Sequence, residues 1–454
     1  QKLMHEASGM KMTLAIDYQS DVDIRLQAGP FSLGVRALRF SGELVLRLEQ
    51  LLDQVPVVGG LVVYFLNPPK IEFSFTGLGM AAEFPGLSGL IRRAVDNAVN
   101  SSIVLPNQVA VPLGSEAQGV DRAELTLAKP LGLLRISAIS GVGLRGPDWE
   151  EHGKEVADAY VVVKTADARW ESSTVEGSAD PVWPEGEFGD VLVYDHEQRL
   201  WATVFDHDHS DTGDFVGASK DLSLIDAFNG SGTLPLFPRE HAGDEDAECG
   251  ELTLGFRFLE FVPGELCGDK LVLCIKVGTV SLPPECGGSA RLLATLGPCQ
   301  QKATPLGREA SEHEGSLAVS DLLRDVILRS SQKGLSLEDI AEITSLDADD
   351  VVAVLEGGEV AEEAVVAKTK RLVRLDSCIF LPFEAELLES ESLELAFADR
   401  KGRVLATTTV DLQHVVEAEE LSVAGLHSMA TEEGAEVSAH VTLALMGTRE
   451  AESM

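Results

Sequence analysis

Apolar and polar residues alternate along the first part of the chain with the period of two that is typical of β-strands buried on one face. The alternation is clearest in four segments, which are residues 14–16, 22–26, 43–49 and 70–75. Between Leu87 and Ala98, apolar residues instead recur at three- and four-residue spacing, and Pro85 lies just ahead of them. That spacing predicts an amphipathic helix that begins near the proline. We therefore expect strands over residues 10–78 and one helix after them.

A second β pattern starts at Leu131, where short apolar segments alternate with Gly, Asp and Pro. The segments are residues 134–136, 160–163, 191–194, 200–205 and 251–258. Many short strands separated by turn residues favour a β-sandwich, which needs about 100 residues or more. The sandwich is expected to span residues 131–262.

Strand-like segments return after residue 263, but a helical stretch from about residue 316 to 374 interrupts them. The strand-like segments are residues 271–275, 291–296, 393–397, 404–408 and 437–443. Within the interruption, Ser336 to Asp339 resembles a capping box, and Asp347 can cap a following helix with Asp350 in its first turn. These patterns predict a second sandwich with a helical insert.

The expected organisation is therefore mainly β with α, in three parts. A first module covers residues 1–115, and a polar linker covers residues 116–130. The first sandwich covers residues 131–262, and the second sandwich with its insert covers residues 263–450.

Charge is distributed unevenly along the 454 residues, which carry 74 acidic and 36 basic side chains for a net charge of −38. Residues 1–130 hold 11 Lys and Arg against 13 Asp and Glu, so almost all of the negative charge lies beyond them. Residues 336–367 of the insert hold ten acidic residues and no Lys or Arg. Such a surface repels phosphates, which argues against nucleic-acid binding. Solubility alone is an alternative reason for the acidic composition.

The six cysteines form no C-x-x-C pair and no compact framework, which favours a reducing, cytosolic setting. The most apolar stretch, Val55 to Leu66, is broken by two glycines and falls short of the roughly 20 residues that span a bilayer. Strand-like alternation begins almost at residue 1, so we expect the chain to start inside a domain, with any membrane anchor upstream.

The first module carries a series of short motifs in a recognisable order. They are Ser41-Gly42-Glu43-Leu44, Pro56-Val57-Val58-Gly59, Phe65-Leu66-Asn67-Pro68-Pro69, Thr76-Gly77-Leu78, Phe84-Pro85-Gly86-Leu87 and Val104-Leu105-Pro106-Asn107. In this order they resemble the SMP domain of extended synaptotagmins and their plant relatives. The resemblance implies a TULIP-like, half-open tube that holds glycerolipid acyl chains, in a family that forms homodimers. The opening helix and first strand of the family are not found in this chain.

Candidate residues for lining a lipid cavity come from the last strand and the helix of this module. They are Ile71, Phe73, Phe75, Leu87 and Ile91. The alternative is that the same residues fill an ordinary hydrophobic core.

Carboxylates gather around the expected loops of the first sandwich. Asp206 and Asp208 follow one expected strand, and Asp214 precedes another. Asp158 lies directly before a third expected strand, and Asp148 lies ten residues before Asp158. Calcium takes six to eight hard oxygen ligands, which carboxylates on flexible loops supply. Several carboxylates in one place repel each other strongly without a cation. The pattern predicts a calcium site, and acidic loops without calcium are the alternative.

The same loops resemble those of a C2 domain. The segments concerned are Ala157-Asp158-Ala159-Tyr160-Val161, Asp180-Pro181-Val182-Trp183, and Phe205-Asp206-His207-Asp208 through Asp214-Phe215-Val216-Gly217. The resemblance implies that Asp206 and Asp208 bridge calcium ions, that Asp214 completes the third loop, and that Asp158 and Asp148 are ligands from the first loop. Glu150, Glu151 and Glu155 compete with Asp148 for that role.

Two other side-chain types near these loops allow further interpretations. Trp149 is a candidate for insertion into the lipid interface, with packing against the sandwich as the alternative. His207 and His209 flank the acids, and this pattern is compatible with a transition-metal site but equally with an exposed loop.

The second sandwich resembles a degenerate C2 domain. It has Asp399-Arg400-Lys401 where the first has Asp206-His207-Asp208, and a lysine in place of a ligand argues against calcium. No site is predicted there.

No catalytic motif of the hydrolase, P-loop or zinc-protease type occurs, so we expect no enzyme. The expected function is lipid transfer and membrane tethering at contact sites of the endoplasmic reticulum, on the cytosolic face. Calcium would dock the first C2 domain to anionic phospholipid. The expected partners are phospholipid membranes, a glycerolipid ligand, a second copy of the chain and a protein that binds the helical insert. The alternative is a calcium-responsive adaptor without lipid transfer.

Overall fold

The computed structural model describes the chain with gaps. The described residues are 2–6, 9–28, 31–76, 87–114, 118, 120, 122–144, 157–207, 214–224, 230–238, 249–282, 289–297, 300–304, 307–309, 327, 331, 336–337, 348–355, 371–430 and 436–451. The chain splits into two compact units, residues Gln1–Glu260 with Glu450–Met454 and residues Phe261–Arg449. Each unit is described by itself.

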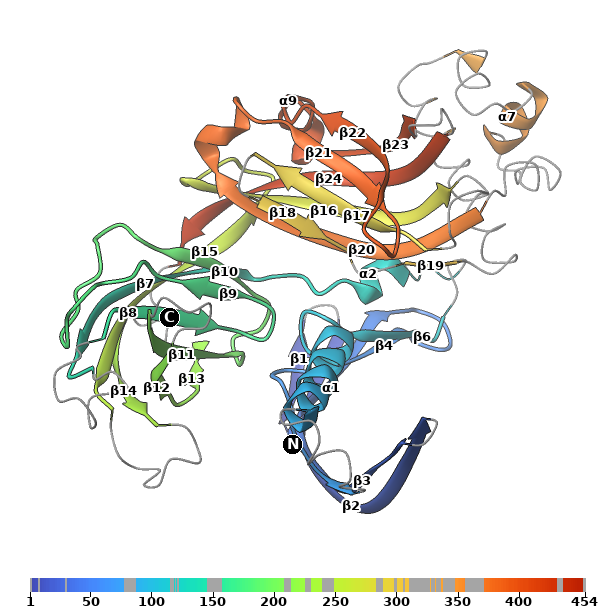
Figure 1. Cartoon of the computed structure of the whole chain (residues 1–454). Helices are drawn as coiled ribbons and strands as arrows, with labels where there is room; N and C mark the ends of the chain where they lie inside the picture. Colours follow the sequence, from blue (N-terminus) through green and yellow to red (C-terminus); the bar gives the residue numbers. More distant parts are fainter. Residues whose placement is uncertain are drawn as a thin grey trace. The chain divides into compact units, whose positions relative to one another are not determined.

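The first unit begins with an antiparallel sheet of six strands (Figure 1). The strands are β1 (Lys2–Glu6), β2 (Gly9–Ala28), β3 (Phe31–Leu51), β4 (Val58–Phe65), β5 (Lys70–Thr76) and β6 (Val109–Pro112). They lie in the order β1-β2-β3-β4-β6, and β5 also pairs with β3. The long strand β3 therefore serves two partners, with residues 34–41 pairing to β5 and residues 44–51 pairing to β4.

The β2–β3 ribbon bends sharply along its length, as Figure 1 shows in blue. The register of the pair shifts between Ser20 and Asp23. On the facing strand, Ala37 has a φ of 52°, and the β3–β5 register shifts between Arg36 and Arg39. Extra residues in a ladder bend and twist a sheet, so these irregularities account for the curvature.

One face of this sheet is closed by a hydrophobic core. Val45, Val62 and Tyr64 are buried on it, and they pack with Leu125 of the short helix α2 (Arg122–Thr126). Gly60 allows this packing, because a Cβ at that position would overlap the Leu125 side chain. Helix α1 (Leu87–Ile103) lies beside β5, where Arg92 donates to the Phe73 carbonyl.

The first sandwich completes this unit and follows the expected pattern. Its strands are β7 (Gly132–Val142), β8 (Ala159–Lys164), β9 (Arg169–Glu171), β10 (Gly189–Val193), β11 (Arg199–Asp206), β12 (Asp214–Ser219), β13 (Leu222–Ser223), β14 (Ser231–Phe237) and β15 (Glu251–Pro263). One sheet has the order β10-β7-β15-β14 and the other β9-β8-β11-β12. Buried residues from both sheets form one core between them. All five predicted strand segments of this sandwich lie on strands, except for Tyr194 at the end of β10.

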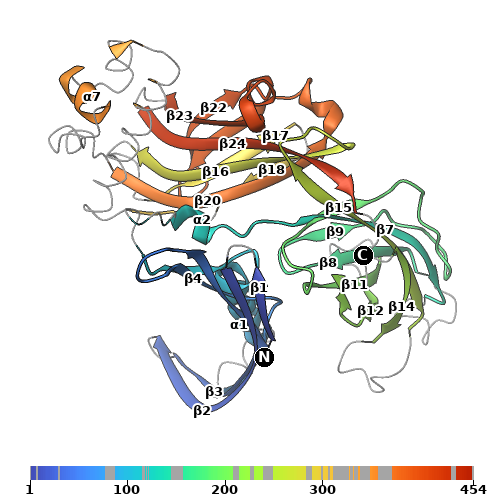
Figure 2. The same cartoon turned by 180° about the vertical axis from the view of Figure 1, so that it is seen from behind.

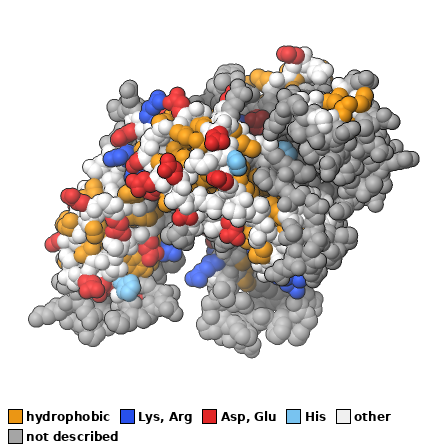
Figure 3. All heavy atoms as spheres, turned by 90° about the horizontal axis from the view of Figure 1, so that it is seen from above, with side chains coloured by type: hydrophobic (Ala, Val, Ile, Leu, Met, Phe, Trp, Pro, Cys, Tyr) orange, Lys and Arg blue, Asp and Glu red, His pale blue; other side chains and the backbone are white. Residues whose placement is uncertain are grey.

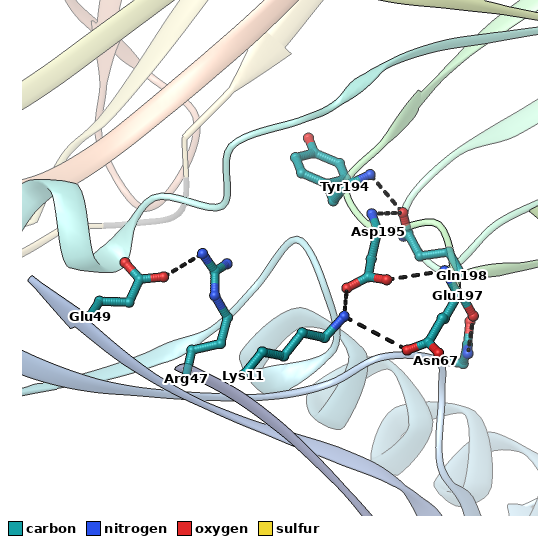
Figure 4. Close-up of polar contacts among 8 residues, drawn as sticks. All are labelled: Lys11, Arg47, Glu49, Asn67, Tyr194, Asp195, Glu197 and Gln198. Atoms are coloured by element: carbon teal, nitrogen blue, oxygen red, sulfur yellow. Dashed lines mark hydrogen bonds and ion pairs between the residues drawn. The ribbon is translucent and has the colours of Figure 1, made fainter. Parts of the chain in front are cut away.

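A buried ion pair joins the first sheet to the turn between β10 and β11 (Figure 4). Lys11 is 6% exposed and Asp195 is 8% exposed, and the Lys11 ammonium contacts the Asp195 carboxylate directly. Glu197 lies 3.7 Å from the same ammonium. Next to this pair, the Arg199 amide donates to Asn67 Oδ1 at 2.8 Å. The contact fixes the turn against β2, because separating the pair would leave buried charges without partners.

The second unit is also a β-sandwich (Figure 2). Its strands are β16 (Lys270–Leu282), β17 (Arg291–Leu296), β18 (Gln300–Ala303), β19 (Arg308–Glu309), β20 (Arg371–Glu384), β21 (Leu393–Ala398), β22 (Val404–Val410), β23 (Ser422–Ala430) and β24 (Glu436–Glu450). One sheet has the order β19-β20-β16-β24-β23 and the other β18-β17-β21-β22. Short helical turns at Ala385–Leu388, Gln413–Val416 and Glu419–Leu421 lie between its strands. The second sandwich that the sequence predicts is therefore confirmed.

The insert is described only in part. Helix α7 (Ala348–Leu355) begins directly after the predicted cap Asp347, which lies outside the described residues. The predicted helical range extends to residue 374, but β20 begins at Arg371, so its last four residues are strand. They are strand because they pair with β16, where Leu282 faces Arg371.

Two cysteines far apart in sequence meet on the second sandwich. Cys274 Sγ on β16 lies 3.1 Å from Cys378 Sγ on β20. The hydrogen bond between the two thiols and burial raise the pKa of Cys378 well above that of an ordinary thiol. Among the described helices, none combines the length and apolar character that crossing a bilayer requires.

Replacing Lys11 with Met tests the buried ion pair. Breaking such a pair by removing one partner costs about 3–5 kcal/mol, because the other charge remains buried. The Arg199 amide depends on Asn67 across the same contact, so its hydrogen exchange should accelerate by at least about 100-fold in Lys11→Met. Amides in the centre of β11 should keep their exchange rates, as measured by NMR.

Lys129→Met is the matched control, because Lys129 pairs with Glu124 on the surface and its side chain is largely exposed. Surface pairs contribute about 1 kcal/mol or less, so this variant should exchange like the unsubstituted chain. Equal Arg199 exchange in Lys11→Met and Lys129→Met would show that the ion pair does not hold the turn.

Candidate functional site

The two faces of the first sheet differ in burial. Val45, Val62 and Tyr64 point to the closed face and are buried. The residues that alternate with them along β3 and β4 point to the other face, because successive side chains of a strand point to opposite faces. This second face is apolar, but most of its side chains are only half-buried, and it comprises Met10, Met12, Leu14, Ile16, Leu44, Leu46, Leu48, Leu61 and Val63. We call these nine residues the open face.

The open face continues onto the edge strand β6. Val109 and Val111 are exposed, and they pair with Val63 and Leu61 of the open face. An apolar surface of this extent that is not closed by a core is characteristic of a binding surface. The β2–β3 pair that carries much of this face bends along its length (Figure 1).

The predicted lining residues lie on β5 and α1, beside β3. Ile71 is half-buried beside Phe40, its partner on β3, and Ile91 of α1 is also half-buried. Phe73 is 6% exposed and lies under α1, since Arg92 donates to its carbonyl at 2.7 Å and lies 4.9 Å above its ring. The side chains of Phe75 and Leu87 lie outside the described residues. Phe73 is therefore buried, while Ile71 and Ile91 are half-buried.

The nine residues of the open face are not among the lining candidates that the sequence predicts. A usable signal is present, because Leu44, Leu46 and Leu48 alternate with other residues on β3. The alternation locates an apolar face but does not say whether another layer covers it. The structure supplies that information, because α2 covers the opposite face while the side chains of this face are half-buried.

The carboxylates of the first sandwich meet at one end of the β8-β11-β12 sheet. Asp206, the last residue of β11, faces Asp214, the first residue of β12. On its other side Asp206 faces Ala159 of β8, so Asp158 lies next to it. Three of the five predicted ligands are thus brought together by strand register, although Asp214 is 56 residues from Asp158 in the sequence.

Hydrogen bonds hold two of these carboxylates in place. Asp206 Oδ1 accepts from the Asp158 amide at 2.8 Å, and Asp158 Oδ1 accepts from the Gly177 amide at 2.7 Å. The His207 amide donates to the Asp158 carbonyl at 2.8 Å. Hydrogen bonds of this kind orient metal ligands in known sites. These hydrogen bonds therefore join the segment before β8 to the segments that follow β9 and β11.

The donor set fits a hard cation. Carboxylate oxygens are the ligands that calcium prefers, and Asp158, Asp206 and Asp214 lie at the same end of one sheet. Within the described ranges, no three His, Cys, Asp or Glu side chains are close enough to form a metal cluster by themselves. Asp148, Asp208 and the insertion candidate Trp149 lie outside the described residues, as does His209. The described part of the site therefore supplies hard oxygen donors but not a complete coordination sphere.

Aromatic rings support this end of the sheet. Tyr160 stacks on Phe205 with 5.6 Å between ring centroids, and Phe205 contacts Phe215 edge-on at 6.3 Å. His207 approaches Tyr160 edge-on at 6.2 Å and is exposed. These rings fix the strand ends from which the acidic loops start.

The Asp-Pro-x-Trp segment has a structural role. Trp183 is buried, and its Nε1 donates to the Ser173 carbonyl at 2.9 Å. Asp180 Oδ1 accepts from the Gly143 amide at 2.8 Å, where Gly143 has a φ of 68°. This contact uses only the side-chain oxygen of Asp180, which links it to the segment around Gly143.

Comparison with known protein families identifies two domains. The family described as synaptotagmin-like mitochondrial-lipid-binding domain matches residues 6–114. The C2 domain family matches residues 132–224. These ranges coincide with the curved sheet and with most of the first sandwich.

Individual relatives agree with this division. Human extended synaptotagmin-2 is 30% identical over 264 residues, which are 56% of this chain and 27% of the human protein. Mouse extended synaptotagmin-2 is 32% identical over 264 residues, which are 56% of this chain and 29% of the mouse protein. The alignments thus cover between a quarter and a third of these relatives' length.

A solved structure extends the comparison to the second sandwich. This structure of extended synaptotagmin-2 contains the SMP domain followed by two C2 domains, and it matches with a TM-score of 0.58 at 18% identity. The match covers 99% of this chain and 86% of that one, and at this identity it concerns the fold alone. Together, the two family matches, the relatives and the fold identify the chain as extended-synaptotagmin-like, with an SMP lipid-binding domain followed by a C2 domain.

Proposed function

We propose that this chain binds and transfers glycerolipids between membranes at contact sites, and that calcium docks its first C2 domain to anionic phospholipid. The single observation that carries the proposal is the open face of the first sheet. Nine apolar side chains lie there, most of them half-buried, while the opposite face of the same sheet is closed by a core. A surface of this kind can shelter acyl chains, each CH₂ of which gains about 0.8 kcal/mol on leaving water.

The calcium step is supported by the charge of the chain. With a net charge of −38, the protein is repelled by an anionic membrane. Asp158, Asp206 and Asp214 add negative charge at one end of the first sandwich. Bound calcium would reverse the sign of that end and bring it to the lipid surface. Docking is thus expected to follow the calcium concentration.

The remaining expectations belong to the same proposal. The chain works on the cytosolic face of the endoplasmic reticulum, near a second membrane, and acts without catalysing a reaction. A second copy would extend the lipid-binding surface, and the acidic insert would bind a protein partner. The alternative function is a calcium-responsive adaptor whose first module has a filled hydrophobic core. Detection of bound lipid would distinguish the two functions.

Leu14→Glu tests the lipid function. Leu14 belongs to the open face and faces Leu44 across the β2–β3 pair. A charge there is incompatible with acyl chains, because burying an unpaired carboxylate costs several kcal/mol. We expect native mass spectrometry of the unsubstituted chain to detect bound glycerolipid, and its occupancy to fall at least about tenfold in Leu14→Glu.

Ala15→Glu is the control, because Ala15 is the next residue of β2, is exposed and points to the opposite face. This variant should retain its lipid. An unsubstituted chain that carries no lipid, or equal occupancy in both variants, would favour the adaptor function.

The calcium site is tested by Asp206→Asn combined with Asp214→Asn. Asparagine keeps the shape of the side chain but removes the negative charge on which calcium binding depends. Calorimetry should show calcium affinity at least about tenfold weaker, and cosedimentation with phosphatidylserine vesicles should lose its calcium dependence.

Glu171→Gln combined with Asp221→Asn makes the same change in net charge at largely exposed positions outside these loops. The control variant should bind calcium like the unsubstituted chain. Absence of calcium binding by the unsubstituted chain would contradict the proposed docking step.

A further inference from the structure

Two thiols lie next to each other on one sheet of the second sandwich. Cys274 Sγ on β16 is 3.1 Å from Cys378 Sγ on β20. Leu273 and Ile275 of β16 and Ile379 of β20 are buried in the core of this sandwich. Because side chains alternate along a strand, both cysteines point away from that core. Each cysteine is half-buried, so small molecules from solvent can reach the pair.

The strand register makes the two cysteines diagonal neighbours. Cys274 faces Phe380, and Cys378 faces Lys276. Diagonal residues on paired strands are about 7–8 Å apart, whereas most disulfides join residues whose Cα atoms are about 4.4–6.8 Å apart. A disulfide between these positions is therefore strained. Strained disulfides are the ones that reductants open readily, which makes such a bond reversible.

The thiol pair lies beside an irregularity in the β16–β20 ladder. The register shifts between Val277 and Thr279, just after Cys274 on β16. Beyond the shift the ladder ends at Arg371, where β20 begins after the insert. An irregular register weakens pairing locally, because it leaves residues of one strand without a partner. A covalent bond beside the shift would hold the two strands together at the end from which the insert departs.

The charge of the protein favours a neutral oxidant. Acidic side chains are spread over much of the described surface in Figure 3, and the chain has a net charge of −38. Such a protein repels an anionic oxidant such as glutathione disulfide, whereas hydrogen peroxide is uncharged. The raised pKa of Cys378 keeps that thiol protonated at neutral pH, so weak oxidants react with it slowly.

We propose that hydrogen peroxide converts Cys274 and Cys378 into a reversible disulfide, which clamps β16 to β20 at the insert end of the second sandwich. One thiolate attacks a peroxide oxygen, so that an S–O bond forms while the O–O bond breaks. The hydroxide that leaves takes up a proton and becomes water, and the product is a sulfenic acid. The second thiolate attacks the sulfenic sulfur, the S–S bond forms, and a second water leaves. In total the two thiols lose two protons and two electrons, and one peroxide is reduced to two waters.

The test treats the reduced full chain with hydrogen peroxide and maps its peptides by mass spectrometry. A peptide that joins Cys274 to Cys378 should appear, lighter than the two free peptides by two hydrogen atoms. Alkylation of both thiols should fall at least about tenfold on oxidation and recover with dithiothreitol. Hydrogen exchange of the amides of residues 371–374 should slow at least about tenfold on oxidation, because the clamped ladder opens less often.

Cys378→Ser removes one partner of the proposed bond and nearly keeps the size of the side chain. In this variant, peroxide should leave the exchange of residues 371–374 unchanged. Cys267→Ser is the matched control, because Cys267 belongs to the same unit but its thiol donates to the Thr448 carbonyl at 3.6 Å. The control variant should form the cross-link and slow its exchange like the unsubstituted chain.

Four results would each overturn the proposal. They are no cross-linked peptide from the unsubstituted chain, a sulfinic acid on either cysteine in place of the cross-link, a cross-link that dithiothreitol leaves intact, and equal slowing of exchange in Cys378→Ser. The peptide map of the unsubstituted chain needs no substitution, so a variant that folds poorly does not decide the outcome. None of these measurements depends on bound lipid or calcium, so failure of the proposed function is distinguishable from failure of this proposal.

Discussion

A β-sheet has two faces, and each apolar face in this protein is either covered by another layer or left partly accessible. In the two sandwiches the apolar faces cover each other, with Val161 and Leu254 in one core and Leu273 and Phe397 in the other. Among the described residues, no second sheet packs on the first one in this way. Helix α2 closes one of its faces, and the other remains largely half-buried. This difference in covering separates the part of the chain suited to hold a ligand from the parts that present loops.

In the sandwiches, the polar and charged residues under discussion lie at strand ends, outside the packed core. Strand register decides which residues meet there. The β11–β12 pair brings Asp206 and Asp214 together, and the β21–β22 hairpin instead closes on Asp399 and presents Arg400 and Lys401. The same fold therefore places different side chains at corresponding strand ends.

Much of this arrangement is predictable from local sequence. Strands such as β8, β11 and β17 are short and apolar on at least one face, so their position follows from the pattern. The start of β20 is not predictable in this way, because the predicted helical insert extends over residues 371–374 and only pairing with β16 makes them strand.

The candidate sites differ in the same respect. Asp158, Asp206 and Asp214 are predicted from the sequence as calcium ligands, because calcium prefers carboxylates, and strand register places these residues at one end of a sheet. The sequence does not predict how far each apolar residue of the first module is covered, since Phe73 is buried while Leu46 is half-buried. Local sequence is enough for the periodicity of the strands, the acidic charge, and the motifs of the SMP and C2 domains, because residues close together in the chain carry each of them. Folding selects which apolar face stays open and which distant groups meet, as Lys11 meets Asp195 and Cys274 meets Cys378. No local sequence pattern predicts such pairs, because they depend on the bending of the sheets and on the register of strands that are far apart in the chain.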